Sequence, residues 1–151
     1  MTYEAIINGA RGLLYFGGNI EKAMSPEDAK LGWNWTFWHT VLKHLVQELS
    51  STAVGPALIA PTASISVKAN APDVRLVARE DDGFLYLITV RRSPTKNGPV
   101  RFTGLPAGIK FGQALFEYDH ENFRTVVVSR GAFTDPFAPH DARVYRFRLP
   151  L

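Results

Sequence analysis

The sequence predicts a mainly β protein, in which an antiparallel β-sandwich of about eight strands follows an N-terminal strand–helix segment. Two observations lead to this prediction. From residue 63 onward, short apolar segments alternate with turns that contain Gly, Pro, Asn and Asp, which is the pattern of a sandwich or barrel. Before residue 53, one continuous apolar run is followed by apolar residues at helical spacing, which indicates α/β structure.

The chain begins with a segment, residues 1–52, that carries this α/β pattern. Residues 3–10 fit the end of a helix, with glycines at its stop. Leu13–Phe16 then form a continuous apolar run, which is typical of a strand buried on both faces in a parallel sheet. We therefore expect a strand at Leu13–Phe16.

Two helices are predicted after this strand. Ser25 is a good N-cap and Pro26 fits the first helical position, so a short helical turn should run to about Leu31. A longer helix is expected from about Thr36 to Ser50, because its apolar residues share one helical face. They are Trp38, Val41, Leu42, Leu45, Val46 and Leu49.

Residues 53–62 contain Gly55, Pro56 and Pro61 and are interpreted as a linker. The sandwich domain is then expected over residues 63–151. Its strands are predicted in the segments SISVKA, VRLVARE, FLYLITV, VRFTGL, GQALFEY, FRTVVVS, AFTDPF and ARVYRFRL.

The composition excludes several classes of protein. The 151 residues suggest one domain, or one small domain with an appendage. The net charge is only +3 and the basic residues are scattered, so we expect no nucleic-acid partner. No stretch approaches the ~18 apolar residues of a membrane span, and the first residues do not form a signal peptide. The sequence thus predicts a soluble protein without a membrane partner, and its compartment stays open.

The segment GWNWTFWH, residues 32–39, holds all three tryptophans. Trp38 falls on the apolar helix face and is expected in the core. Trp33 and Trp35 precede the helix in a loop, where indole rings either stack on the apolar faces of sugar rings or cap the core. Both interpretations remain open for these two residues.

The glycines and asparagine of GGN, residues 17–19, follow the predicted strand. In parallel α/β architectures, ligands bind at the C-terminal ends of strands, and Asn19 could hydrogen-bond a ligand hydroxyl there. The alternative is a tight turn. The segment lacks the glycine spacing of a phosphate-binding loop.

No catalytic residue, metal ligand or cofactor is predicted. Glu80, Asp81 and Asp82 form an acidic turn, and the sequence has no cysteine for a thiolate site. His39 and His44 are five residues apart, whereas zinc-binding helices use a spacing of four.

The order of these segments resembles the C-terminal end of a (β/α)8-barrel, or TIM-barrel, glycoside hydrolase. The resemblance is carried by AIINGARGLLYFGGN, the aromatic loop, the amphipathic helix, and the sandwich that contains VRLVAREDDGFLYLITV. It implies that Leu13–Phe16 is the eighth barrel strand and Thr36–Ser50 the last barrel helix. A whole barrel takes about 250 residues, and the catalytic carboxylates of such enzymes sit on earlier strands.

The resemblance implies an accessory C-terminal region of a carbohydrate-active enzyme that is not catalytic alone. Asn19, Trp33 and Trp35 would contact the sugar, and the sandwich would stabilise the barrel. The expected partners are a carbohydrate and the missing barrel, or a second copy of the chain that contacts the N-terminal segment.

Two alternatives remain. The first is a free-standing carbohydrate-binding module whose stacking platform combines Trp33 and Trp35 with Tyr86 or Tyr118. The second is a structural, self-associating β-sandwich protein.

Overall fold

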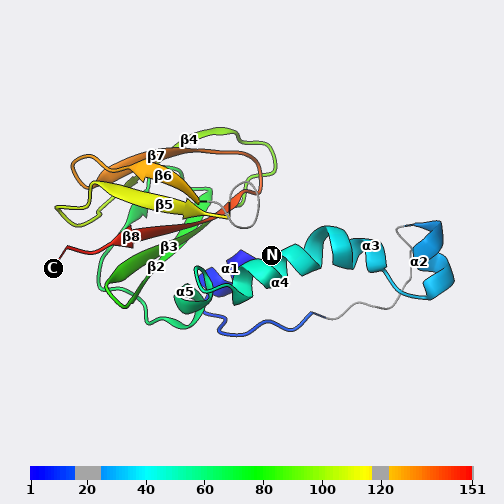
Figure 1. The fold of residues 1–151 in the computed structure, drawn as a ribbon. Helices are drawn as coiled ribbons and strands as arrows, with labels where there is room; N and C mark the ends of the chain where they lie inside the picture. The colour runs from blue at the N-terminus through cyan, green and yellow to red at the C-terminus, as the bar shows by residue number, and fades with distance from the viewer. Residues whose placement is uncertain (16–24, 117–122, 151) are drawn as a thin grey trace.

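The computed structural model describes residues 1–15, 25–116 and 123–150. A β-sandwich lies at one end of the molecule (Figure 1). The helices are α1 (Thr2–Ile7), α2 (Pro26–Leu31), α3 (Trp35–Phe37), the π-helical turn η1 (Trp38–Leu42), α4 (Lys43–Ser50) and α5 (Gly55–Ile59). Helices α1 and α5 lie against the sandwich, and the other helices from the first part of the chain lead away from it to the opposite end.

Within the described ranges, the chain forms eight strands in two antiparallel sheets. A five-stranded sheet has the order β2-β3-β8-β5-β6, and a three-stranded sheet has the order β1-β4-β7. The strands are β1 (Lys68–Ala69), β2 (Val74–Asp81), β3 (Phe84–Arg91), β4 (Gly98–Thr103), β5 (Phe111–Leu115), β6 (Phe123–Val127), β7 (Ala132–Phe137) and β8 (Ala142–Arg148). The predicted mainly β, antiparallel sandwich is confirmed, although β1 is shorter than the predicted segment SISVKA.

The sandwich core lies between the two sheets and is rich in aromatic rings. Phe102 from the smaller sheet stacks on Phe133 at a centroid distance of 4.8 Å, and Phe133 meets Tyr145 of the larger sheet edge-on at 4.9 Å. Gly112 lies directly against the ring of Phe147, where a Cβ atom would collide with two ring carbons. Close packing of this kind leaves no room for a side chain at position 112.

The outer face of the larger sheet is partly covered by helices α1 and α5. Along β3, Leu85 and Leu87 face the core between the sheets, whereas Tyr86 and Ile88 face a second cluster beneath the helices. Ile6 of α1 and Ala57 of α5 belong to this second cluster. Because both of its faces are covered, β3 is buried almost without interruption, which is why its sequence is a continuous apolar run.

A buried arginine joins the helices to the sheet. The side chain of Arg79 is 2% exposed and donates hydrogen bonds to the carbonyl oxygens of Leu58 at 2.5 Å and Ile6 at 3.0 Å. These carbonyls belong to the last turns of α5 and α1, where a cation complements the helix dipole. Burial lowers the pKa of the Arg79 guanidinium below its ordinary value, and the nearby charge of Arg11 acts in the same direction.

The strand predicted at Leu13–Phe16 is not present over its described part. Residues 13–15 are irregular, and Leu14 is 79% exposed. A parallel strand needs neighbours with which to pair its backbone groups, and none of the described strands, which are all antiparallel, pairs with residues 13–15. The segment instead borders α4, where Leu13 and Tyr15 line a cavity of about 270 Å³ with Val46 and Leu49. Phe16 lies outside the described residues.

The helices after this segment follow the sequence closely. Ser25 caps α2 through its hydroxyl, which accepts a 3.0 Å hydrogen bond from the backbone N–H of Asp28. The predicted helix at Thr36–Ser50 is confirmed as the continuous run α3–η1–α4, which extends away from the sandwich (Figure 1). No residue of this helical run is buried, so the expectation that Trp38 lies in the core is wrong for this chain.

The segment predicted as a linker contains α5, and Val54, Ala57 and Ala60 within it are buried. It therefore packs on the larger sheet rather than crossing open solvent. Among the described residues, no helix is long and apolar enough to cross a membrane.

Candidate ligand-binding site

Trp33 and Trp35 form an exposed aromatic pair at the junction between α2 and α3. The junction turns at Gly32, whose φ of 65° lies in the left-handed region that terminates many helices. The two indole rings are 6.2 Å apart between centroids and tilted by 55°. Each of the two residues is 43% exposed, so neither is buried in the core.

His39 extends this aromatic surface by one helical turn. Its imidazole stacks on Trp35 with a centroid distance of 6.0 Å and an interplanar angle of 30°. Trp35 and His39 line an open depression of about 610 Å³ together with Glu27, Asp28, Leu31, Thr36 and Thr40. Ligand pockets commonly have volumes of about 300–1,000 Å³ and combine apolar surface with a few polar groups.

Asp28 fixes the geometry of this junction. Its side chain is 1% exposed, and its Oδ1 atom accepts a 3.0 Å hydrogen bond from the backbone N–H of Thr36. Burial by itself raises the pKa of the Asp28 carboxyl. Hydrogen bonds from Thr36, from the Ser25 hydroxyl and from the Trp35 backbone outweigh burial, so the pKa is lowered. The ionised carboxylate of Asp28 therefore stabilises the first turn of the helical run, which begins at Trp35.

The sequence-predicted site residues therefore have different outcomes. Trp33 and Trp35 lie side by side as an exposed pair, whereas Asn19 is outside the described residues. Tyr86, named for the alternative stacking platform, is 4% exposed and lies under the helices, so it offers no face to a sugar. Tyr118 is also outside the described residues.

Sequence reasoning missed the roles of His39 and Asp28. His39 follows Trp35 by four residues, which places both on one helical face once a helix is assumed. Asp28 stands at the position of a capping acid in α2, but its hydrogen bond to Thr36 depends on the path of the chain after Gly32, which no local pattern encodes.

A buried carboxylate elsewhere is fully engaged in structure. Asp135 on β7 is 1% exposed and accepts hydrogen bonds from Arg124, Arg143 and Tyr145. It is thus enclosed by its partners and does not face a ligand. Within residues 1–15, 25–116 and 123–150, no group of three or more His, Asp or Glu side chains could hold a metal ion.

Comparison with protein families gives no match for this chain, and comparison with curated proteins gives none either. Among solved structures, the chain is similar to a GH30 endoxylanase from Clostridium papyrosolvens C71, at 11% sequence identity and a TM-score of 0.42. The similarity covers 54% of this chain, which spans about a fifth (21%) of the length of that protein. A similarity of this size carries no information about activity or substrate.

Proposed function

We propose that this chain is an accessory C-terminal region of a carbohydrate-active enzyme of the glycoside hydrolase type. In this proposal Trp33 and Trp35 contact the sugar, the sandwich stabilises the enzyme, and the chain has no hydrolytic activity alone. The observation that carries the proposal is the helical run α3–η1–α4, whose sequence has a complete apolar face. Leu45 and Leu49 near its C-terminal end pack against the second cluster, but no residue of the run is buried.

An apolar helix face that is only partly covered is unfavourable in an isolated chain. Most helical stability in proteins comes from packing of the apolar face rather than from intrinsic propensity. Val41 and Val46 on this face are 45% and 38% exposed. In the barrel that residues 5–50 resemble, the same face would pack against barrel strands, so a barrel domain is the partner proposed for this surface.

The aromatic pair supports the carbohydrate part of the proposal. Indole rings stack on the apolar C–H faces of sugars. Trp33 and Trp35 are both half-exposed, and Trp35 lines an open depression. The buried carboxylate of Asp28 accepts a hydrogen bond from the backbone N–H of Thr36, and a junction that is ordered before binding lowers the entropy lost when a ligand binds.

Self-association is the second candidate function, because the same apolar helix face can also be covered by another copy of the chain. Static light scattering over a range of protein concentrations distinguishes the two. A dimer whose mass falls to that of a monomer in a Val41→Lys variant would favour self-association through the helix. A monomer at all concentrations would exclude it.

Affinity electrophoresis in gels that contain neutral polysaccharides tests the sugar-binding part. We expect retardation on at least one glycan, lost in Trp33→Ala and Trp35→Ala and kept in Trp38→Ala, which changes the same residue type one helical turn away. Absence of retardation on every glycan would contradict the role of the aromatic pair. Hydrolysis of aryl glycosides by the chain alone would contradict the claim that it is not catalytic.

A further inference from the structure

The outer face of the five-stranded sheet is covered over only part of its length. Towards the helices, Tyr86, Ile88, Leu115 and Val144 lie in the cluster beneath α1 and α5. Farther along the same strands, the face carries side chains that no helix covers. We call this part the open half; it consists of Phe84, Phe111, Gln113, Thr125, Val127, Arg146 and Arg148.

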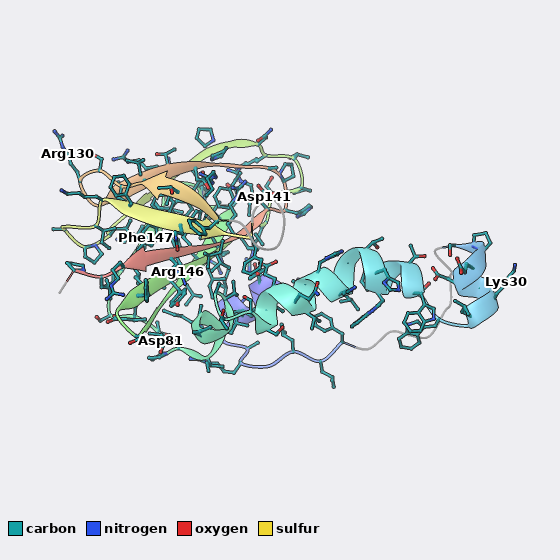
Figure 2. The ribbon with its side chains drawn as sticks, viewed as in Figure 1. Lys30, Asp81, Arg130, Asp141, Arg146 and Phe147 are labelled. Carbon is teal, nitrogen blue, oxygen red and sulfur yellow. The ribbon has the colours of Figure 1, made fainter. Side chains whose placement is uncertain are left out.

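The strand register places these residues in two adjacent rows. Arg146 on β8 pairs with Gln113 on β5, which pairs with Thr125 on β6. In the next row, Phe84 pairs with Arg148, and Phe111 pairs with Val127. Arg146 and Phe147, both labelled in Figure 2, are consecutive on β8 and therefore face opposite sides of the sheet.

The open half is hollowed and presents exposed apolar side chains beside its polar ones. It contains a depression of about 410 Å³ between β3, β8, β5 and β6. Phe111 is 61% exposed and Val127 is 66% exposed. An exposed phenyl ring in an antiparallel sheet is a flat surface on which a planar or ring-shaped ligand can stack.

The two arginines give this surface its charge. The guanidinium carbons of Arg146 and Arg148 lie 5.2 Å and 5.0 Å from the centroid of the Phe84 ring. The positive charges of both arginines therefore lie over the same ring, and an anion bound between the two guanidinium groups would relieve their repulsion. None of the described carboxylates forms an ion pair with either arginine, although Asp81 lies opposite Phe84 in the same row.

One of these arginines is held in a fixed orientation. Arg146 donates from Nε and Nη2 to the Oε1 atom of Gln113, at 3.1 Å and 2.6 Å. Its Nη1 group and the whole guanidinium of Arg148 donate to no side chain or backbone group in the described parts of the chain. Free guanidinium donors of this kind suit the oxygen atoms of a carboxylate.

We propose that the open half binds the carboxylate groups of an acidic polysaccharide, a polymer that contains uronic acid units. The arginines hold the carboxylate, and Phe111 stacks on a sugar ring. The polysaccharide nature of the ligand rests on the proposed function, whereas the need for a carboxylate rests on the two arginines alone. The small and scattered positive charge of the chain argues against a nucleic acid, which is bound through extended basic surfaces.

Isothermal titration calorimetry with polygalacturonate tests the proposal, with its fully methyl-esterified form as the uncharged probe. We expect binding to polygalacturonate only. In Arg148→Gln the affinity should fall roughly tenfold, as expected for one charge-assisted hydrogen bond, and Phe111→Ala should also weaken it. The control Arg101→Gln removes an exposed arginine from β4 in the other sheet and should leave the affinity unchanged.

Three results with these probes and variants would overturn the proposal, and a fourth comes from the aromatic pair. The three are equal affinity for the methyl ester, an equal loss of affinity in Arg101→Gln, and tighter binding of single-stranded oligo(dT) that depends on Arg148. The Trp33→Ala, Trp35→Ala double variant separates this site from the aromatic pair. Unchanged polygalacturonate binding by this variant supports an independent site, and lost binding overturns it.

Discussion

The phenolic hydroxyl of Tyr145 on β8 donates a 2.7 Å hydrogen bond to the carboxylate of Asp135 on β7, and so joins the two sheets of the sandwich. Arg124 on β6 contacts both oxygens of the same carboxylate at 2.7 Å, and Arg143 approaches one of them at 3.3 Å. A buried carboxylate with this number of donors is well satisfied. This acidic side chain therefore adds a polar link between two sheets that also share an apolar core.

Replacing Asp135 by alanine should strongly destabilise the protein. The substitution leaves Arg124 and Arg143 without their shared partner, and loss of one member of a buried ion pair costs about 3–5 kcal/mol. Urea unfolding followed by circular dichroism measures this loss. The matched variant Asp81→Ala, at an exposed site on β2, should change the free energy of unfolding by less than about 0.5 kcal/mol. Equal effects of the two substitutions would show that Asp135 has no special role.

Replacing Arg79 by methionine should loosen helices α1 and α5. The carbonyl oxygens of Leu58 and Ile6 would lose a charged donor, at a cost of about 2–3 kcal/mol. Hydrogen exchange should become faster in α1 and α5 and remain slow in β7. The same substitution at Arg75, which is exposed on the same strand, is the control. Unchanged exchange in α1 and α5 of Arg79→Met would contradict the proposed attachment.

The stability of the junction at Asp28 should depend on pH. Because the pKa of Asp28 is lower in the folded protein than in the unfolded chain, the carboxylate stabilises the fold above its unfolded pKa of about 3.9. This contribution is lost as the pH falls through the lower, folded pKa. Far-ultraviolet circular dichroism from pH 6 downward should show helix loss in acid that is smaller in Asp28→Asn.

The neighbouring acid provides the control for this experiment. Glu27 is exposed in the same helix, so Glu27→Gln should retain the acid-induced loss of helix. If Asp28→Asn loses as much helix in acid as the unaltered protein does, carboxylates other than Asp28 cause the loss.

Lysine substitutions on the exposed part of the apolar helix face, at Val41 or Val46, should be tolerated. We expect Val41→Lys to change the free energy of unfolding by less than about 0.5 kcal/mol, as is usual for surface positions. The same change at Val54, which is completely buried, places an unpaired charge in the core and should prevent stable folding. Strong destabilisation by Val41→Lys, measured by thermal unfolding, would show that the helix face is covered in the isolated chain.

Much of the fold could be predicted because its signals are local. The turn-forming residues between short apolar segments marked the antiparallel sandwich, and Ser25 with Pro26 marked the start of α2. The spacing of apolar residues marked the helix at Thr36–Ser50. Each of these signals depends on residues a few positions apart, so no knowledge of distant contacts was needed.

The remaining features depend on contacts between distant segments. Leu13–Phe16 has the sequence of a buried strand, but a strand forms only where a neighbour supplies paired backbone groups, and residues 13–15 have none. Tyr86 is buried because α1 and α5 pack on the outer face of the larger sheet. Asp135 lies among charged residues from other strands, and its role follows from their positions in space rather than from the sequence around it.

Tryptophan fluorescence tests the central claim of a sugar site at Trp33 and Trp35 most directly. All three tryptophans of the chain lie within residues 33–38, so the emission reports on this junction alone. Titration with the neutral polysaccharide that retards the protein most should shift the emission of Trp33 and Trp35 to shorter wavelength, and the double alanine variant should show no shift. An unchanged emission spectrum at saturating polysaccharide would contradict the account.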